Sequence, residues 1–214
     1  MVFLTQDQVD DLAAAIGPRY EMLVRTAALA GMRQGELFAL TTADLDLPRG
    51  RITVTKSLND LGHELVVGPT KTRQSRTVRI PLHLAEALAS HIERFPGPNG
   101  LLFTSSEGTL IRRSNFLRRH FHPAVEDSGI PSDTRFHDLR HTCAAILIDR
   151  GWSLEQLKRH LGHSSIRVTS DRYAHLYEGH DDDLMDALDR DLRARPHRPR
   201  PAQATVTMLR TDTG

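Results

Sequence analysis

The sequence predicts a mainly α-helical domain with a small antiparallel β-sheet. Apolar residues recur at helical spacing over most of the 214 residues. The stretch between residues 51 and 80 instead has the alternation and the β-branched side chains that are typical of strands. Hydrophobic residues make up 39% and charged residues 26% of the chain, which is ordinary for a globular protein and excludes wholesale disorder.

Three helices are expected before the strands. The first begins after Thr5, an N-cap residue with a glutamine, Gln8, at position N3, and it ends at Gly17. The second covers residues 20–30. The third is short and covers residues 34–40.

Three strands are expected next, over residues 51–55, 63–67 and 76–80. Residues 59–62 have the composition of a turn between the first two strands, and Gly68 lies between the next two. Strands joined by such short links pair in antiparallel fashion. We therefore expect one three-stranded antiparallel sheet.

The rest of the chain is predicted to be mostly helical, with one short strand over residues 101–103. We expect a single domain over residues 1–192, and a disordered tail over residues 193–214 because that segment is rich in proline and arginine. The later helices are expected over residues 82–95, 114–126, 137–150, 153–162, 168–177 and 182–192.

Composition excludes several classes of protein. A single cysteine, Cys143, excludes a disulfide framework and a cysteine-based zinc site. The sequence contains no apolar run near the roughly 20 residues that span a bilayer, and no basic signal-peptide region. We therefore expect a cytoplasmic protein with no membrane partner. The net charge of +1 does not by itself indicate a nucleic-acid partner, although the positive charge is clustered.

Four segments carry groups suited to phosphoryl chemistry: residues 31–37, 70–76, 137–140 and 161–173. Two arginines can hold a phosphate, a histidine can move a proton near neutral pH, and a lysine can protonate a leaving oxygen. A tyrosine phenol becomes a nucleophile when cations and a base lower the cost of ionising it. Because no cluster of acidic residues at metal-ligand spacing accompanies these segments, we expect no metal and no other cofactor.

In this order, the four segments resemble the catalytic domain of the tyrosine recombinases, the phage integrase family. The most specific part is Leu161-Gly-His163-Ser-Ser-Ile166, followed by Arg172-Tyr173-Ala-His175. The resemblance covers about residues 3–192. It implies the fold of that domain, which breaks and rejoins DNA strands.

The resemblance also implies which residues hold the scissile phosphate. Arg33 and Arg140 match the two family arginines that bind it. His163 matches the position that hydrogen-bonds the phosphate. Glu36 matches the acidic residue that supports the site.

Three further residues match the groups that make and break bonds. Tyr173 matches the nucleophile, which forms a transient 3′-phosphotyrosine bond and so conserves bond energy without ATP. Lys71 matches the general acid for the leaving 5′-hydroxyl, and His137 matches the proton-transfer histidine. Tyr173 lies one residue farther from the Leu-Gly-His motif than in many relatives, which leaves Tyr177 as an alternative nucleophile.

Other basic residues are candidates for DNA contacts, with a solvated surface as the alternative reading. His137 and His141 are four residues apart on a predicted helix, which also suits a metal pair, but no third ligand is evident. We interpret His141 as a packing residue behind the site. The candidate DNA contacts are Arg73, Arg76, Arg112, Arg113, Arg118 and Arg119.

The expected function is site-specific recombination of duplex DNA attachment sites, in integration or excision of a mobile element. The resemblance implies a tetramer on DNA and a monomer when free, bound to the nucleoid when on DNA. The alternatives are a DNA-relaxing activity like that of type IB topoisomerases, and a DNA-binding remnant without turnover. Relatives usually carry a helical core-binding domain before this one, and this chain starts almost at the catalytic domain.

The last predicted helix carries an apolar stripe, Leu184, Leu188 and Leu192, at a spacing of four residues. The simplest interpretation is a terminal helix that packs within its own chain. In the family, the segment after the tyrosine often docks on a neighbouring subunit. Docking on a second copy is therefore the alternative.

Overall fold

The computed structural model of the chain describes residues 1–70, 75–177 and 180–194. It comprises two compact units, Met1–Leu176 and Tyr177–Gly214. The predicted domain limit at residue 192 lies within the second unit. Lys71, Arg73 and nearly all of the predicted tail lie outside the described residues.

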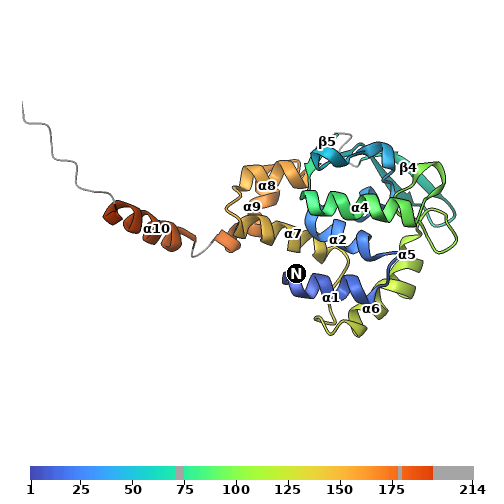
Figure 1. Ribbon diagram of the computed structural model, residues 1–214, viewed down its shortest axis with the longest axis horizontal. Coiled ribbons are helices and arrows are strands. Elements are labelled where there is room, and N and C mark those ends of the chain that lie inside the picture. The colour runs from blue at the N-terminus through green and yellow to red at the C-terminus, as the bar shows by residue number, and fades with distance from the viewer. Residues whose placement is uncertain (71–74, 178–179, 195–214) are drawn as a thin grey trace, which may run out of the picture. The chain divides into compact units, whose positions relative to one another are not determined.

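The core of the first unit is built around the helix α2 (Glu21–Ala30), which packs against α1 (Gln6–Ala15), α4 (Leu82–Arg94) and α7 (Asp138–Asp149) (Figure 1). Seven of its ten residues are buried, so it faces apolar neighbours on most sides. The predicted helical character of this part of the chain is confirmed.

Capping residues fix where these helices begin and end, as the sequence predicts. Thr5 accepts a hydrogen bond from the backbone N–H of Gln8 (3.2 Å), and the Gln8 side chain accepts one from the Thr5 N–H (2.9 Å). Ser153 and Gln156 form the same reciprocal pair before α8 (Leu154–Leu161). Gly162 ends α8 in the left-handed conformation, at φ +68°.

The strands form two small antiparallel sheets, where the sequence predicts one. β2 (Arg51–Val54) is central in a three-stranded sheet, with β1 (Leu45–Asp46) on one side and β5 (Arg76–Arg79) on the other. β3 (Lys56–Asp60) and β4 (Leu65–Pro69) form a separate hairpin. The predicted α+β class is confirmed, but the predicted order of pairing is wrong.

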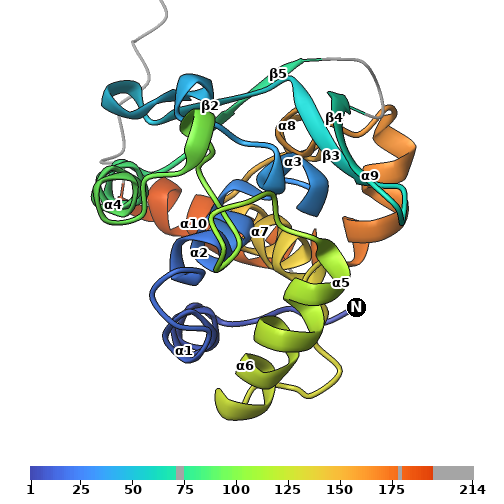
Figure 2. The same cartoon turned by 90° about the vertical axis from the view of Figure 1, so that its right-hand side faces the viewer.

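The predicted hairpin differs from the observed one because the turn lies later in the chain than the composition suggests. The Leu61 N–H donates to the Glu64 carbonyl (3.0 Å), so the turn follows residue 60 and not residue 58. β3 is polar and lacks β-branched residues, so it gives little strand signal. β3 packs against α3 (Gln34–Phe38), and Figure 2 shows β5 above α8 on the same side of the molecule.

The predicted helix over residues 114–126 is divided. α5 (Arg113–Phe116) leads into a π-helical turn, η4 (Leu117–Phe121), and then into α6 (His122–Asp127). The His122 N–H donates to the Leu117 carbonyl five residues back, next to Pro123, which has no N–H to continue the regular ladder. The predicted strand over residues 101–103 is reduced to one bridge between Thr41 and Leu101.

Two further helices follow α8, one in each unit. α9 (Ile166–Tyr173) is capped by Ser165 and belongs to the first unit, where it packs against α8. α10 (His180–Ala194) belongs to the second unit and exposes Met185, Leu188 and Leu192. No helix in the described part of the chain combines the length and the apolar composition that a membrane span requires. The remaining short elements are the 3₁₀ turns η1 (Thr42–Asp44), η2 (Leu47–Arg49), η3 (Pro98–Gly100) and η5 (Ala174–Tyr177).

The end of α2 passes close to α7 and α8. Gly31 ends α2 at φ +60°, and a Cβ atom there would lie 2.8 Å from Leu161 Cδ2 and 2.9 Å from Cys143 Sγ. Any larger residue would push these helices apart. Cys143 is buried, and burial raises the pKa of its thiol to about 12.

Replacement of Gly35 by alanine is expected to destabilise the domain by about 1–3 kcal/mol. Its Cβ would lie 2.6 Å from Ser57 Oγ and 2.7 Å from the Leu58 carbonyl, so α3 and the β3–β4 hairpin would have to separate. Chemical denaturation measures the loss.

The matched control is Gly68→Ala in the same hairpin, where a new Cβ would lie 3.8 Å from its nearest neighbour, Asn59 Nδ2. We expect this variant to remain within about 0.5 kcal/mol of wild type. Equal stability of the two variants would show that the close approach of α3 does not constrain residue 35.

Candidate active site

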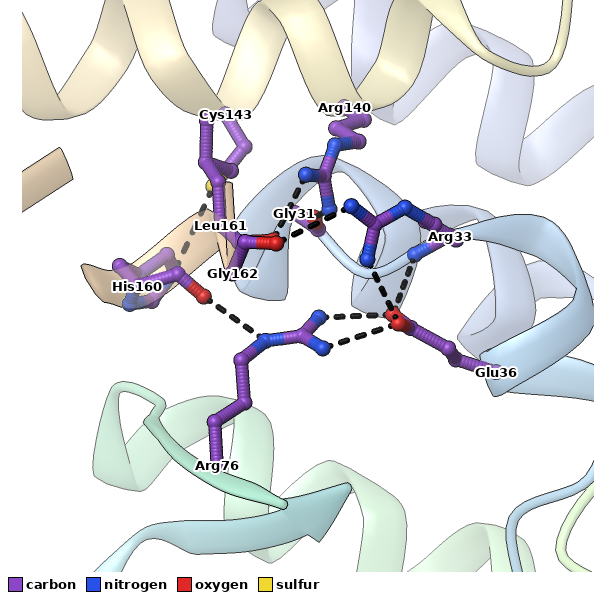
Figure 3. A network of polar contacts seen from close by, with 9 residues as sticks. All are labelled: Gly31, Arg33, Glu36, Arg76, Arg140, Cys143, His160, Leu161 and Gly162. Atoms are coloured by element: carbon purple, nitrogen blue, oxygen red, sulfur yellow. Dashed lines mark hydrogen bonds and ion pairs between the residues drawn. The ribbon is translucent and has the colours of Figure 1, made fainter. Parts of the chain in front are cut away.

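A buried carboxylate, Glu36 of α3, lies at the centre of a polar network (Figure 3). Arg76 binds it with two parallel hydrogen bonds, Nη1 to Oε1 at 2.9 Å and Nη2 to Oε2 at 2.7 Å. Arg33 adds a hydrogen bond from Nη1 to Oε1 (3.0 Å) and one from its backbone N–H to Oε2 (2.8 Å). Glu36 therefore fixes two arginines from different elements.

The charge state of Glu36 follows from these partners. Burial alone would raise its pKa, but the hydrogen bonds and charge of Arg76, together with Arg33, outweigh burial and lower the pKa to about 2. The carboxylate is therefore ionised throughout the physiological range. It compensates part of the positive charge around it.

The C-terminus of α8 accepts hydrogen bonds from three arginines. The last carbonyls of a helix have no partner within the helix and lie at the negative end of its dipole. Here they point to guanidinium groups from three separate elements, as Figure 3 shows. The pairs are Arg76 Nε to His160 O (3.1 Å), Arg140 Nη2 to Leu161 O (2.7 Å) and Arg33 Nη2 to Gly162 O (3.1 Å).

Arg140 of α7 is the most enclosed of the three, with 2% of its surface exposed. Its second anchor is the Gly31 carbonyl, which accepts from Nη1 at 2.5 Å. Burial and the charges of Arg33 and Arg76 lower its pKa to about 9, which leaves it cationic at neutral pH. Three guanidinium groups and one carboxylate give this cluster a net positive charge, which attracts an anion.

Tyr173, at the end of α9, is fully buried beside this cluster. Its phenol oxygen lies 2.8 Å from Nδ1 of His141, and its ring stacks against His163 with centroids 6.3 Å apart. Burial raises the pKa of the phenol, while the charges of Arg140 and Arg172 lower it. Burial prevails, so the pKa lies above its ordinary value of 10; the nearby cations reduce this rise, and with it the cost of forming the ionised nucleophile.

His163 follows the end of α8 and is held by α9. Its Nδ1 lies 2.9 Å from the Thr169 hydroxyl, and its Nε2 is buried with no hydrogen-bond partner among the residues that the structure describes. Burial and the charge of Arg140 lower its pKa to about 3, so the ring is neutral at neutral pH. A ring whose Nδ1 accepts from Thr169 carries its proton on Nε2, free to bind an acceptor.

His137, the N-cap residue of α7, is exposed at a cleft of about 1060 Å³. The cleft is bordered by Arg33, His141 and Arg172 on the side of the site, and by the β3–β4 hairpin and Arg113 elsewhere. Burial and the charge of Arg140 lower the pKa of His137. Of the predicted catalytic residues, His137 and Arg33 face the cleft, while Arg140, Tyr173 and His163 lie behind it.

The candidate DNA contacts differ in their surroundings. Arg76, expected on a surface or on the DNA backbone, is instead largely buried, because its guanidinium is bound to Glu36 and the His160 carbonyl. Arg112 binds Asp60 (2.9 Å) and the Gly62 carbonyl (2.8 Å), which ties the hairpin to the segment before α5. Arg113 borders the cleft, and Arg118 and Arg119 are exposed. Arg73 and Lys71 lie outside the described residues.

Sequence reasoning missed three residues of this site. His141 was expected to pack or to lie behind the site, and it contacts the phenol of Tyr173 directly, 32 residues away in the chain. Thr169 holds His163, and Arg172 borders the cleft. The spacing of His137 and His141 showed that both share a helix face, but not what that face meets. Among the described residues, no group of three or more His, Cys, Asp or Glu side chains could hold a metal ion.

A mainly helical domain that holds three arginines near one buried carboxylate, with His141, His163 and Tyr173 beside them, has the architecture of a tyrosine recombinase catalytic domain. The Phage integrase family model matches residues 2–180. The chain belongs to this family.

Individual relatives agree with this assignment. The chain is 32% identical over 188 residues to the putative prophage phiRv2 integrase of Mycobacterium tuberculosis, covering 86% of this chain and 50% of that protein. The chain spans about half the length of the curated relatives it matches.

Two solved structures have the same fold. The catalytic domain of bacteriophage HP1 integrase matches with a TM-score of 0.60 and 26% identity, over 92% of this chain and 96% of that one. The Tn1549 transposon integrase, in complex with transposon right end DNA, matches with a TM-score of 0.73 and 24% identity, over 88% of this chain and 65% of that one. The fold predicted from the resemblance is thereby confirmed.

Replacement of Glu36 by glutamine is expected to cost about 3 kcal/mol of stability, because it leaves the buried Arg76 guanidinium without a counter-charge. The folded-state pKa is about 2 and the ordinary value is 4.5, so the stabilisation is fully present above pH 4.5 and is lost as the pH falls toward 2. Urea denaturation over this pH range should show a shallower acid decline in the variant than in wild type.

The control is Asp46→Asn, which removes a carboxylate from an exposed ion pair with Arg49. This variant should lose less than about 1 kcal/mol. A loss at Glu36 no larger than the loss at Asp46 would contradict a central role for the buried carboxylate.

Proposed function

We propose that this chain is the catalytic part of a site-specific DNA recombinase that cleaves and rejoins DNA strands through Tyr173. The observation that carries the proposal is the placement of the Tyr173 phenol beside a buried, net positive arginine cluster. A tyrosine in such a cluster can attack a phosphodiester whose negative charge the arginines hold.

The scissile phosphate is held by Arg33 and Arg140. Each guanidinium carries five N–H donors in a planar fork, of which two are directed to the internal partners described above. The remaining donors are available to phosphate oxygens. The unpartnered Nε2 of His163, whose ring stacks against Tyr173, supplies a further donor.

Cleavage forms a bond between Tyr173 Oη and phosphorus and breaks the bond to the 5′-oxygen. Lys71, as the resemblance implies, protonates the leaving oxygen. The strand is then held as a 3′-phosphotyrosine, and a 5′-hydroxyl from another DNA end reverses the reaction. Because one phosphate ester replaces another, the bond energy is conserved and the step requires no ATP.

The buried position of Tyr173 adds a conformational step to this mechanism. The phenol lies behind His141, whereas Arg33 and His137 border the cleft. Attack on a phosphate in the cleft therefore requires α9 to advance relative to α3. Internal bonds of the arginines to α8 hold the cluster in place until that movement.

The substrates are duplex attachment sites of a mobile element, since the matched relatives include a prophage integrase and a transposon integrase. The exposed Arg113, Arg118 and Arg119 are proposed to contact this DNA, together with Arg73. Two such sites are joined by a tetramer, and the free chain is monomeric. The protein acts in the cytoplasm, on the nucleoid.

The test is covalent trapping on a nicked suicide duplex that carries the attachment site, in the presence of EDTA. Wild type should form a DNA–protein adduct, and Tyr173→Phe should form none. The matched control, Tyr177→Phe, should retain the adduct, because the phenol that lies beside His141 and the arginine cluster is that of Tyr173.

Each alternative predicts a different result. An adduct that persists in Tyr173→Phe and disappears in Tyr177→Phe moves the nucleophile to Tyr177. DNA binding without any adduct indicates a remnant without turnover. Relaxation of a supercoiled plasmid that lacks attachment sites indicates a topoisomerase-like activity.

A further inference from the structure

The two ring nitrogens of His163 have opposite surroundings. Nδ1 lies 2.9 Å from the hydroxyl oxygen of Thr169, a residue of α9 that is fully buried. Nε2 is also buried, but within the described ranges of the chain it has no hydrogen-bond partner. One side of the ring is therefore held, and the other side is free to meet a ligand.

The proton of the Thr169 hydroxyl decides which nitrogen of His163 carries the ring proton. A buried hydroxyl needs an acceptor for its proton, and in the part of the chain that the structure describes, Nδ1 of His163 is the one acceptor that contacts it. Thr169 therefore donates to Nδ1. The ring is neutral, since burial and the charge of Arg140 lower its pKa to about 3. Because a neutral imidazole has one accepting and one donating nitrogen, the ring proton lies on Nε2.

The free Nε2–H group belongs to a residue that lies beside two of the arginines. His163 directly follows Leu161 and Gly162, whose carbonyls accept from Arg140 (2.7 Å) and Arg33 (3.1 Å). The charges of both arginines act on its ring. A buried N–H without an acceptor is unfavourable, and a phosphate oxygen held by the same arginines would satisfy it.

We propose that Thr169 is a positioning residue for strand cleavage: its hydroxyl fixes the tautomer and the orientation of His163, so that Nε2 donates to the scissile phosphate. The inference rests on the proposed function, in which His163 binds that phosphate and Tyr173 attacks it. It adds a residue that acts through His163 and not on the reacting atoms themselves.

Thr169 also connects His163 to the nucleophile. Thr169 and Tyr173 are four residues apart on α9, so they lie on the same face of the helix. The imidazole that accepts from Thr169 also stacks against the ring of Tyr173, with an interplanar angle of 7°. One helix face thus sets the position of the phosphate donor and of the nucleophile together.

This hydrogen bond is local, and we expect it to persist when α9 advances. It joins two residues that are six apart in one continuous segment, which begins at the end of α8 and contains Tyr173. The contact of Tyr173 with His141 instead joins two separate helices, α7 and α9, and is broken before attack.

The experiment measures single-turnover adduct formation on the suicide duplex at saturating DNA. Thr169→Val keeps the shape of the side chain but removes the hydroxyl, so His163 loses the donor that fixes its tautomer. We expect the rate to fall by about 10–10²-fold, less than the about 10²–10³-fold loss that follows removal of a transition-state donor. The Kd for DNA should change by less than about 2-fold, because the donor acts mainly in the transition state.

A rescue variant and a double-mutant cycle separate positioning from a structural role. Thr169→Ser restores the hydroxyl and should recover the wild-type rate to within about 3-fold. If Thr169 acts through His163, Thr169→Val should change the rate by less than about 2-fold in the His163→Phe background. A Thr169→Val rate within about 3-fold of wild type, or an equal loss in both backgrounds, would overturn the proposal.

The matched control is Thr26→Val, which removes another fully buried helical hydroxyl. Thr26 donates to the Met22 carbonyl (2.6 Å) within α2 and has no part in the site. This variant should keep the wild-type rate even if it is less stable. A loss of rate equal to that of Thr169→Val would show that the effect is structural and would contradict the proposal.

A second measurement uses the wild-type chain, in case Thr169→Val does not fold. Nuclear magnetic resonance of isotope-labelled histidine reports which ring nitrogen carries the proton, and the His163→Phe variant identifies the signal of His163. We expect the proton on Nε2. A proton on Nδ1, with an adduct still formed by wild type, would overturn this inference alone, whereas absence of an adduct in wild type would overturn the proposed function and this inference together.

Discussion

The arrangement of the site depends on one buried carboxylate. Glu36 holds Arg76 through two hydrogen bonds and Arg33 through two more, and its low pKa keeps it charged in all ordinary conditions. Arg76 belongs to a strand and also binds the end of α8, so the same interaction joins the sheet, α3 and α8. Without this charge, three cations would share a buried space with no counter-ion.

The positive charge that remains influences the protonation of the neighbouring histidines and tyrosine. Together with burial, which is the larger cause, it keeps the rings of His141 and His163 neutral, and it offsets part of the rise in pKa that burial causes at Tyr173. The helix carbonyls at the end of α8 hold the arginines without neutralising them, because each carries only a partial charge. The cluster is therefore positively charged and fixed in position, so it can bind a phosphodiester with little reorganisation.

Much of the fold could be predicted because its signals are local. Thr5 with Gln8, and Ser153 with Gln156, mark helix starts within four residues of sequence. The β3–β4 hairpin could not be predicted, because β3 is polar and carries no β-branched residue, so its composition does not indicate a strand. The contact of His141 with Tyr173 could not be predicted from the sequence either, because it depends on how α7 and α9 pack and not on spacing along either helix.

The burial of Cys143 has a practical consequence for studies of this protein. Thiolates react with alkylating reagents and oxidants, and a thiol with a pKa of about 12 forms almost none at neutral pH. It is also the sole cysteine in the sequence and lies enclosed beneath Gly31. A cysteine introduced on an exposed helix face would therefore be labelled selectively by a maleimide dye, and fluorescence distances between chains could be measured without removing the native thiol.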